Sequence, residues 1–480
     1  LIASHRNIFG VASPKLLRIQ RFLKVFPGLV VPLELREDSS LVHEAVNNPK
    51  KNLNISRMLK ALAKIAGDAH DPRFYVRGFV LSNTESAKDI EAGLTLAKRH
   101  LKQERLPVVP LFESAHSLSH GAEIIEELLE KPRIRATSKK YWNGQLEVML
   151  GYSDSAKENG SFASRHLIQT AIAKLERVIK KHDIEPIFFH GSGGSIERGG
   201  GGVQEQTDWW PLSALLCVKV TVQGEMIYRN YTAPEILDRQ LERFLTARDL
   251  KSQTHVTKLP KALEQALSKM AMATQAAYQD TMKDPHFLQL IEEATPYSYL
   301  NNLKMGSRPS KRQGPVNLKG LRAIPWVLCW TQTRALFPSW WGVGRFWKEL
   351  SAKDKAVYRK AFKQSALFRT YIKAVGFTLE KIELDIFALY LHNSKLPQEI
   401  QDHYLKEFKA EFAAAKKCVH EVTGERNLLW YRPWLRTSIS LRSPLIHPLN
   451  VLQLIALKEK DLLLLRETVT GVASGMLTTG

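Results

Sequence analysis

LEVMLGYSDSAKENGSFASRHLIQTAIAKLERVIKKHDIEPIFFHG, residues 146–191, contains two β-rich runs separated by a polar turn and a long helical stretch. The helical stretch, residues 161–182, carries an apolar stripe at helical spacing with lysines and arginines on the other side. The stripe consists of Ile168, Ile172, Leu175 and Ile179. A strand, a helix and a further strand within this length predict a βαβ unit with parallel strands.

Similar units recur from residue 29 to about residue 224. The predicted strands are residues 29–36, 74–82, 106–114, 146–154, 186–191 and 216–224. Near-continuous apolar strands that alternate with helices predict a parallel sheet, either doubly wound or closed into a barrel. A doubly wound sheet more often has a Gly-rich fingerprint after its first strand, and none is present there. The barrel alternative predicts chemistry at the C-terminal strand ends, whose polar residues are Arg36, Glu113, Asp154 and His190.

Beyond residue 230 the pattern is helical. Amphipathic segments occur at residues 232–250, 258–283, 352–376, 377–393 and 398–420, and residues 306–320 have the Gly, Pro and cations of a surface loop. We therefore expect an α/β protein with a partial β/α (TIM-type) barrel embedded in a predominantly α-helical chain. The expected domains are residues 1–228, which hold the strand-helix units, and residues 229–480, which are mainly helical.

The composition is that of a folded protein, with 480 residues, 44% hydrophobic and 24% charged. Its net charge of +21 favours anionic partners, which could be nucleic acid, a membrane surface or small polyanions. The three cysteines, Cys217, Cys329 and Cys418, form neither a disulfide framework nor a zinc pattern, which predicts a reducing cytoplasm. The apolar runs are too short to cross a bilayer, and residues 1–10 lack the pattern of a signal peptide.

A glycine-rich segment, HGSGGSIERGGGG (190–202), follows the fifth predicted strand. Its backbone N–H groups could converge on an anion, to which Arg198 would add a forked donor. The alternative is a flexible loop, and the spacing is not that of a P-loop.

Two carboxylates and a lysine lie near neighbouring strand ends. Glu113 ends one strand, and Asp154 and Lys157 follow the next one, in GYSDSAKENG (151–160). Paired carboxylates suit Mg²⁺ or Mn²⁺, which prefer oxygen ligands. The alternatives are an ordinary turn capped by Ser153 or Ser155, or carboxylates that act as helix N-caps.

The segment RAIPWVLCWTQTRALFPSWWGVG (322–344) places Arg322 and Arg334 around an aromatic run. Such a run could stack nucleic-acid bases, but it is more typical of a buried helix whose few arginines point at a cavity. Because the cations of the chain form no obvious stripe or known binding module, we expect no nucleic-acid partner.

Together these segments resemble phosphoenolpyruvate carboxylase. The similar segments, in family order, are LELREDSS (33–40), PLFES (110–114), VMLGYSDSAKENG (148–160), FHGSGGSIERGGGG (189–202), TVQGEMI (221–227), MGSRPSKR (305–312), RAIPWVLCWTQTR (322–334), SPLIHPLNVLQ (443–453) and GVASGMLTTG (471–480). The resemblance implies a β/α barrel buried among helices, usually in a cytoplasmic homotetramer. It also implies a reaction in which phosphoenolpyruvate and bicarbonate, with Mg²⁺ or Mn²⁺, give oxaloacetate and phosphate.

The resemblance also implies residue roles. Glu113 and Asp154 would hold the metal, and the substrate phosphate would be held by Arg36, Arg322 and Arg334. Bicarbonate attacks phosphorus to give carboxyphosphate and an enolate, and the enolate captures the CO₂ that carboxyphosphate releases. The catalytic residues matched to the carboxyphosphate and bicarbonate sites are Arg198, Lys157 and His190.

The chain also departs from the family pattern. The Thr-Ala-His-Pro-Thr motif is absent, and two of eight barrel strands would be missing, so we expect the C-terminal part of a longer enzyme. Ser192 occupies a position where the family commonly has Arg, and Glu197 replaces a usual Gly. These changes favour the alternative of a catalytically inactive fragment or degenerate paralogue with a structural or regulatory role. The retained site residues favour an enzyme.

Regulation by feedback inhibitors is expected to be altered. Lys381 and Arg442 match two residues of the family's inhibitory aspartate site, whereas Leu477-Thr478 replaces the usual Arg-Asn. Because both replaced side chains are donors to a carboxylate, we expect weak or absent inhibition by aspartate or malate.

Overall fold

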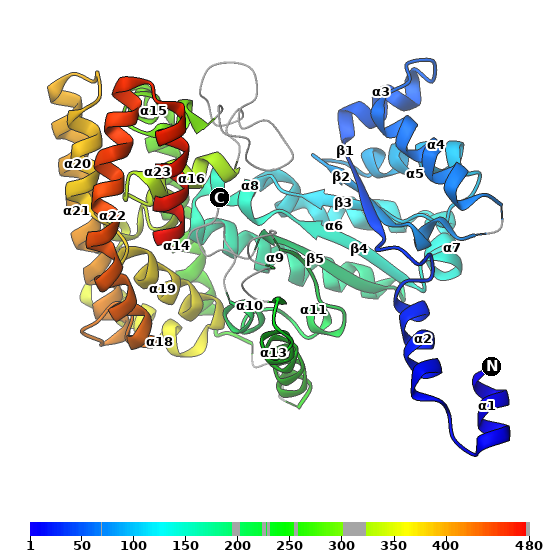
Figure 1. Ribbon diagram of the computed structural model, residues 1–480. Helices are drawn as coiled ribbons and strands as arrows, with labels where there is room; N and C mark the ends of the chain where they lie inside the picture. The colour runs from blue at the N-terminus through cyan, green and yellow to red at the C-terminus, as the bar shows by residue number, and fades with distance from the viewer. Residues whose placement is uncertain are drawn as a thin grey trace. The chain divides into compact units, whose positions relative to one another are not determined.

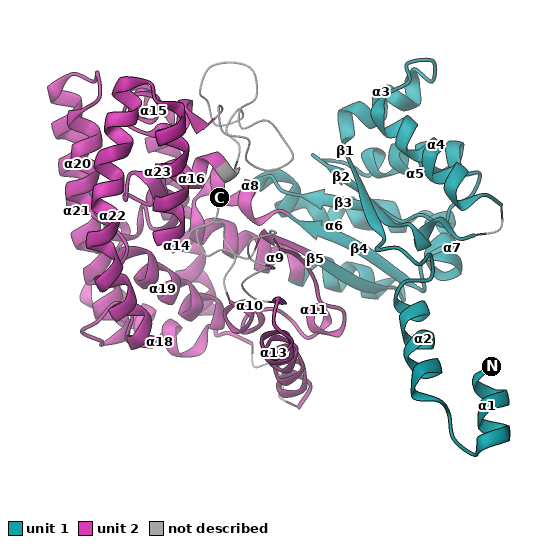
Figure 2. Ribbon diagram, in the orientation of Figure 1, with its two compact units in different colours: residues 1–150, 173–189 teal, residues 151–172, 190–480 magenta. Residues whose placement is uncertain are grey.

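The computed structural model describes residues 1–68, 70–193, 202–222, 227, 231–253, 258–300 and 323–476. Contacts divide the chain into two compact units (Figure 2). Unit 1 consists of Leu1–Leu150 and Ala173–Phe189, and unit 2 of Gly151–Ile172 and His190–Gly480. The two units interleave along the chain. The domain boundary expected after residue 228 rests on the change from strand-helix to helical sequence pattern, not on contacts. It stays a prediction.

A six-stranded sheet has the strand order β1-β2-β3-β4-β5-β6, so that each strand lies beside the next one in sequence. The strands are β1 (Leu33–Asp38), β2 (Val76–Ser82), β3 (Val108–Phe112), β4 (Gln145–Leu150), β5 (Glu185–Gly193) and β6 (Lys219–Val222). This order lacks the reversal of a doubly wound sheet and is consistent with part of a β/α barrel. The TIM-type assignment stays a prediction.

The strands form where the sequence has uninterrupted apolar runs. All five residues of β3 are buried, and in β2 only Arg77 is exposed. β1 to β4 lie side by side (Figure 1) and pair in parallel, with Arg36 opposite Val80 and Leu111 opposite Met149. Burial of both faces is expected of a parallel sheet covered by helices. A cluster on this sheet consists of Val80, Val109, Leu111, Met149 and Phe189.

Unit 1 has helices before its first strand and between its strands. They are α1 (Ile2–Phe9), α2 (Pro14–Val25), α3 (Ser39–Asn47), α4 (Asn54–Ala66), η1 (Pro72–Phe74), α5 (Ala87–Leu101), α6 (Ala115–Leu129) and α7 (Pro132–Tyr141). The helix predicted at 161–182 is confirmed as α9 (Ser161–Lys181). α9 begins in unit 2 and ends in unit 1.

The rest of unit 2 is almost entirely helical. Its helices are α8 (Tyr152–Asn159), α10 (Val203–Thr207), α11 (Ser213–Leu216), α13 (Pro234–Gln253), α14 (Lys261–Lys283), α15 (Pro285–Glu293), η3 (Pro296–Ser298), α16 (Ala323–Gln332), η5 (Phe337–Ser339), α17 (Val343–Glu349), α18 (Ala352–Gln364), α19 (Ala366–Leu379), α20 (Leu384–His392), α21 (Gln398–Thr423), α22 (Pro433–Glu459) and α23 (Leu462–Gly475). Its core includes the aromatic run of the sequence, since Trp326, Trp330 and Trp340 are each at most 1% exposed.

Two predicted helical segments have different limits. The segment 352–376 is two helices, because the Ser365 hydroxyl caps α19 by accepting a hydrogen bond from the Phe368 N–H. The segment 377–393 becomes helical only at Leu384. In the described ranges, no helix combines the length and the apolar composition needed to cross a membrane. The loop expected at 306–320 lies outside the described residues.

Candidate functional site

In unit 1 the structure brings together Arg36 and Glu113, two of the sequence-predicted residues. Arg36 lies on β1, Glu113 directly follows β3, and Nη2 of the arginine is 3.8 Å from Oε2 of the glutamate. The Asn83 N–H also donates a hydrogen bond to Glu113 Oε1, at 3.1 Å. Glu113 is not a helix cap, because the neighbouring Ser114 caps α6. A cation from β1 and a carboxylate that follows β3 therefore meet near the C-terminal edge of the sheet.

Asp154 and Lys157 lie on a helix rather than at the end of a strand. The predicted strand 146–154 ends at Leu150, and α8 begins two residues later, so Ser153 and Ser155 are inside the helix and do not cap it. Asp154 and Lys157 are consequently one turn apart, and Lys157 Nζ donates to Asp154 Oδ1 at 3.2 Å. The lysine side chain is 8% exposed and the aspartate side chain 42%.

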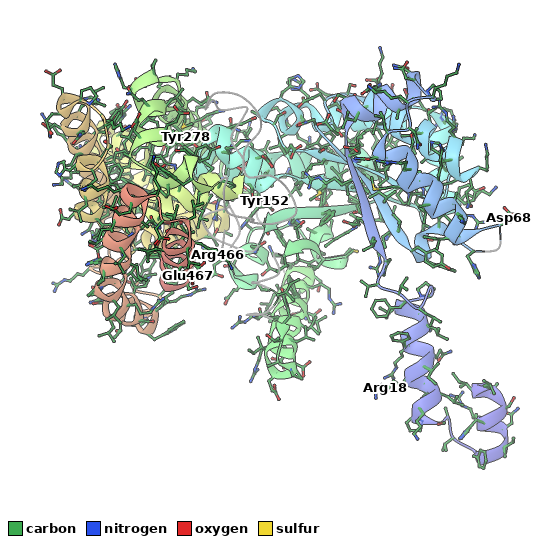
Figure 3. All side chains as sticks on the ribbon, turned by 45° about the horizontal axis from the view of Figure 1, so that its top comes forward. Arg18, Asp68, Tyr152, Tyr278, Arg466 and Glu467 are labelled. Carbon is green, nitrogen blue, oxygen red and sulfur yellow. The ribbon has the colours of Figure 1, made fainter. Side chains whose placement is uncertain are left out.

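α8 is held in place by α14. The Tyr278 hydroxyl donates a hydrogen bond to the Lys157 carbonyl oxygen at 2.9 Å, and the Gln275 side-chain amide donates to Asn159 Oδ1 at 2.6 Å. Tyr278 is fully buried, and Figure 3 labels it together with Tyr152, the first residue of α8. These contacts fix the last turn of α8. The Lys157 ammonium is thus a buried positive charge that could stabilise an oxyanion, with its direction set by packing.

His190 is part of a buried hydrogen-bonded triad. Its Nδ1 is 2.7 Å from the Tyr152 hydroxyl, and Trp210 Nε1 donates to the same hydroxyl oxygen at 3.2 Å. Burial lowers the pKa of His190 to about 3, so the imidazole is neutral near neutral pH. Since the hydroxyl oxygen accepts from Trp210, its own proton is available for His190 Nδ1. When the hydroxyl donates to Nδ1, the proton of the neutral ring is on Nε2.

His190 Nε2 is buried and lacks a hydrogen-bond partner within the part of the chain that the structure describes. A buried donor without a partner costs about 1–3 kcal/mol unless a ligand or water accepts its hydrogen bond. The motifs of the sequence indicated His190 but neither Tyr152 nor Trp210. The adjacent pair Trp209-Trp210 is visible in the sequence. Periodicity cannot predict its contact with Tyr152, however, because the two segments are 58 residues apart.

Two residues singled out in the glycine-rich segment, Glu197 and Arg198, lie outside the described residues. Arg322, Leu477 and Thr478 also lie outside them. Ser192 is described and is 1% exposed, and its hydroxyl donates to Gln206 Oε1 at 3.1 Å. The position where the family commonly has a cation is therefore part of a neutral polar contact.

Arg334 is buried among the helices of unit 2. α16 ends just before it, Arg334 has a φ of 60°, and its side chain is 1% exposed. Its Nη2 donates to Ser443 Oγ at 2.6 Å and to the Lys381 carbonyl oxygen at 3.3 Å, and lies 3.9 Å from Glu383 Oε1. Nε and Nη1 have no partner among the described residues, and burial lowers the pKa of this guanidinium to about 10. Buried donors without partners are consistent with an anion-binding role.

The two predicted regulatory residues make contacts within the protein. Lys381 is 2% exposed, and its Nζ lies 4.2 Å from the centre of the Phe377 ring. Arg442 Nη1 donates to the Gly475 carbonyl oxygen at 2.6 Å, and its Nε donates to the Ser438 carbonyl oxygen at 3.1 Å. Both side chains are thus already engaged with the helices around them.

The expected metal ligands fit a hard divalent cation in their donor chemistry. Glu113 and Asp154 present carboxylate oxygens, which Mg²⁺ and Mn²⁺ prefer. The Asp154 side chain is 42% exposed, and Glu113 Oε2 lies 3.8 Å from Arg36 Nη2. Within the ranges that the structure describes, no three His, Cys, Asp or Glu side chains gather as a metal cluster. Mg²⁺ is usually bound through one or two carboxylates plus waters and substrate, so a site with two protein carboxylates needs no such cluster. The assignment of Glu113 and Asp154 as its ligands remains a proposal.

Comparison with known proteins gives one consistent result. The sequence model of the family described as phosphoenolpyruvate carboxylase matches residues 33–480. A phosphoenolpyruvate carboxylase of Xanthomonas campestris pv. campestris is 34% identical over 424 residues, covering 84% of this chain and 46% of the relative. Those of Shewanella loihica and Prochlorococcus marinus strain MIT 9312 are 33% and 32% identical, covering 84% and 86% of this chain and 46% and 43% of the relatives. The chain spans about half the length of the curated relatives it matches.

Proposed function

Because the chain belongs to the phosphoenolpyruvate carboxylase family, we propose that it is the catalytic portion of an enzyme that makes oxaloacetate and phosphate from phosphoenolpyruvate and bicarbonate. The observation that carries this proposal is the arrangement on α8. This one helix supplies Tyr152, which holds His190, and the ion pair of Asp154 with the buried Lys157. A carboxylase of this kind needs positive charge and fixed donors around anionic substrates, and α8 provides both.

In the first step bicarbonate attacks phosphorus, and the products are carboxyphosphate and the enolate of pyruvate. Arg36, Arg322 and Arg334 hold the phosphate group in this proposal, because a guanidinium offers forked donors to phosphate oxygens. Glu113 and Asp154 would hold Mg²⁺ or Mn²⁺, which supplies charge neutralisation at the developing enolate. The contribution of the protein is mainly positioning and electrostatic stabilisation.

In the second step carboxyphosphate releases CO₂, and the enolate carbon forms a bond to it. Arg198 and Lys157 hold the carboxyphosphate, and the Lys157 ammonium remains oriented by Asp154. His190 donates a hydrogen bond from Nε2 to a bicarbonate or carboxyphosphate oxygen, while Nδ1 stays bound to Tyr152. A neutral imidazole suits this role, because it orients the oxygen without transferring a proton to it.

The natural enzyme is proposed to be a cytoplasmic homotetramer, as the resemblance implies. A second candidate function is that of a non-catalytic structural or regulatory paralogue. The contact between Ser192 and Gln206 favours it, because this position carries no cation for the substrate phosphate. The two functions differ in one measurable property, the formation of oxaloacetate.

The test is bicarbonate-dependent oxaloacetate formation by the full natural protein with Mg²⁺ or Mn²⁺. The informative variant is Lys157→Met, which keeps the side-chain length but removes the charge. Its control is Lys180→Met, because Lys180 is also a helix lysine paired with a carboxylate, Glu176, but is 46% exposed. We expect Lys157→Met to lose about two orders of magnitude in kcat/KM, with Lys180→Met unchanged. A folded natural protein without activity would establish the non-catalytic alternative.

A further inference from the structure

Buried polar side chains from α16, α20 and α22 form a closed ring of hydrogen bonds in unit 2. The Tyr390 hydroxyl donates to Gln453 Oε1 at 2.6 Å, and the Gln453 side-chain amide donates to Gln332 Oε1 at 2.8 Å. The Asn450 side-chain amide closes the ring, because it donates to the Gln332 carbonyl oxygen at 2.7 Å and to the Tyr390 hydroxyl at 3.1 Å. Each of these side chains is at most 2% exposed. Polar groups buried this deeply are costly unless they are paired, so the ring holds its helices in one arrangement.

The polar ring completes the C-terminal end of α16. The last carbonyl groups of a helix have no partner within the helix and need another donor. Gln332 is the last residue of α16, and its carbonyl oxygen accepts the hydrogen bond from Asn450. The Gln332 side-chain amide donates in turn to the Val469 carbonyl oxygen on α23, at 3.1 Å. The end of α16 is therefore tied to both C-terminal helices.

Arg334 follows this helix end by two residues. Its φ of 60° lies in the left-handed region, which residues other than glycine rarely adopt unless neighbouring contacts hold them there. The Arg334 N–H donates to the Thr331 carbonyl oxygen at 3.2 Å, and the Arg334 carbonyl oxygen accepts from the Glu383 N–H at 3.1 Å. The direction of the guanidinium thus depends on where α16 ends and how the chain turns there. Asn450 supplies the side-chain donor for that end.

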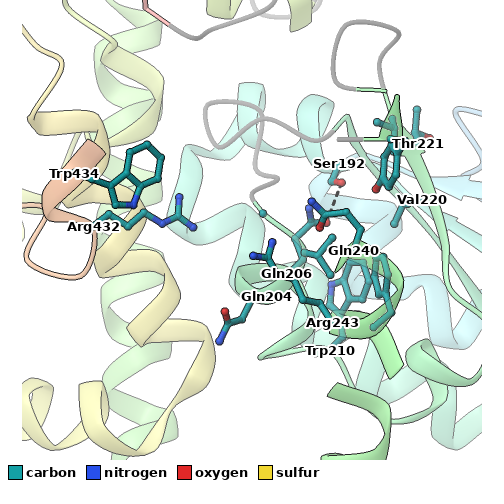
Figure 4. A pocket seen from close by; sticks show the side chains of 15 residues that line it. Ser192, Gln204, Gln206, Trp210, Val220, Thr221, Gln240, Arg243, Arg432 and Trp434 are labelled. Atoms are coloured by element: carbon teal, nitrogen blue, oxygen red, sulfur yellow. Dashed lines mark hydrogen bonds between the residues drawn. The ribbon is translucent and has the colours of Figure 1, made fainter. Parts of the chain in front are cut away.

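The replacement at Ser192 makes the placement of Arg334 more important. The family commonly has Arg at this position, whereas the Ser192 hydroxyl donates to Gln206 Oε1 (Figure 4). A neutral side chain offers the substrate phosphate no charge, so under the proposed function Arg334 carries a larger share of phosphate binding. Because the paired hydrogen bonds of a guanidinium to phosphate are directional, a small displacement of Arg334 should be costly.

We propose that Asn450, together with Gln453 and Tyr390, is a positioning residue for Arg334. The polar ring fixes the end of α16 and thereby directs the guanidinium at the substrate phosphate. This inference rests on the proposed function, which assigns the phosphate to Arg334. Asn450 touches no substrate and acts through the arginine. Loss of the ring should therefore weaken the use of phosphoenolpyruvate and leave bicarbonate, which other residues hold, unaffected.

Steady-state kinetics of the full natural protein test this inference. Asn450→Leu keeps a similar side-chain volume and removes the donor to the Gln332 carbonyl oxygen. We expect it to raise the KM for phosphoenolpyruvate by about tenfold or more, to change kcat by less than about threefold and to leave the KM for bicarbonate unchanged. A merely structural role would give a different result, because fewer folded molecules lower the apparent kcat without changing either KM.

The dependence on Arg334 is tested in an Arg334→Met background. Calorimetric titration with phosphoenolpyruvate in the absence of bicarbonate measures affinity there without requiring catalysis. Asn450→Leu should weaken this affinity by about tenfold in the parent protein and by less than about twofold in Arg334→Met, because the guanidinium that it positions is then absent. Equal losses of affinity in the two backgrounds would overturn the inference.

Two tyrosines provide a matched pair of variants. Tyr390→Phe removes a hydroxyl from the polar ring, whereas Tyr358→Phe removes one that donates to the Ala266 carbonyl oxygen outside the ring, at 2.8 Å. Both tyrosines are 2% exposed, so the two changes place a similar demand on the fold. We expect Tyr390→Phe to raise the KM for phosphoenolpyruvate by about threefold or more and Tyr358→Phe to leave it unchanged. The same KM in both variants would contradict a positioning role.

Hydrogen exchange separates failure of this inference from failure of the proposed function. In Asn450→Leu the backbone amides of residues 325–336 should exchange about tenfold faster than in the parent protein, while those of α21 keep the parent rate. Unchanged exchange at residues 325–336 would overturn the positioning role in an active or an inactive protein. A natural protein that makes no oxaloacetate would overturn the proposed function instead. Faster exchange at residues 325–336 would then support the positioning of Arg334 and remove only its link to catalysis.

Discussion

The imidazole of His190 lies flat against the indole of Trp210, with ring centroids 3.7 Å apart and ring planes inclined by 12°. The stack covers one face of a histidine that is fully buried. The same indole donates its N–H to the Tyr152 hydroxyl, which contacts the histidine from its edge. Trp210 therefore contributes both to the burial of His190 and, through Tyr152, to the orientation of its ring.

The buried histidine predicts a pH dependence of stability. The pKa of His190 is lowered by burial from 6.5 to about 3, so as pH falls the unfolded chain takes up this proton before the folded chain does. The stabilising contribution of neutral His190 is complete above about pH 6.5 and is lost as pH falls from there toward about 3, by at most about 1.4 kcal/mol per pH unit.

Urea denaturation at about pH 7 and about pH 5 measures this contribution. We expect the free energy of unfolding to fall less steeply with acid in His190→Gln than in the parent protein. His392→Gln is the control, because His392 is exposed. Equal pH slopes for the parent and His190→Gln would contradict the prediction.

The Tyr152 hydroxyl is predicted to stabilise the fold through two buried contacts. Tyr152→Phe leaves His190 Nδ1 and Trp210 Nε1 without their partner, which should cost about 1–3 kcal/mol of unfolding free energy. The control is Tyr299→Phe, because Tyr299 is 37% exposed and should tolerate loss of its hydroxyl with a change within about 0.5 kcal/mol. Thermal and urea unfolding of both variants tests the difference. A similar small effect in both would show that the triad contributes nothing.

The strand-helix alternation was predictable because it depends on local periodicity. All six predicted strands are present, and β2, β3 and β5 overlap most of their predicted ranges. The end of β4 was misplaced by four residues, because α8 follows the strand after a single residue and starts with no side-chain cap that would mark its first turn. The prediction therefore placed Asp154 at a strand end, whereas the structure has it on α8, where it pairs with Lys157.

The contacts of the site were less predictable than its members. The motifs identified Arg334, but its burial and its bond to Ser443 join segments that are 109 residues apart in sequence. No pattern in a single sequence encodes such a pairing. The same holds for Arg36 and Glu113, which meet only because parallel strands bring their C-terminal ends to one edge.

The hydrogen bond between Arg334 and Ser443 predicts that substitutions of these two residues have strongly non-additive effects on the free energy of unfolding. The Ser443 hydroxyl accepts from the buried guanidinium at 2.6 Å and itself donates to Glu383 Oε1 at 2.7 Å. A hydrogen bond to a charged group contributes about 1.5–3 kcal/mol, so Ser443→Ala should cost about this much. In an Arg334→Met background the same change should cost much less, because no buried charge is left unsatisfied.

A double-mutant cycle followed by urea unfolding measures this coupling. Ser440→Ala is the control on the same helix, because Ser440 is exposed and should change stability equally little in both backgrounds. Additive effects of Ser443→Ala and Arg334→Met would mean that the serine does not compensate the buried charge.

Feedback inhibition by L-aspartate or L-malate is predicted to be weak or absent. Arg442 already donates to the Gly475 and Ser438 carbonyl oxygens, and the Lys381 ammonium lies over the Phe377 ring. A carboxylate group of either inhibitor would have to replace these internal contacts. In addition, the Arg-Asn donors that are usual in the family are replaced by Leu477-Thr478. We therefore expect L-aspartate and L-malate to bind weakly or not at all.

Calorimetric titration with each acid tests this prediction without depending on catalytic activity. Oxaloacetate formation measured across the same concentrations provides a second readout in an active protein. Arg442→Gln and Lys381→Met should leave both readouts unchanged, because in this protein the two cations serve internal packing. Binding or inhibition at ordinary concentrations of either acid that is relieved by both variants would show instead that the inhibitor site is functional despite its two replaced donors.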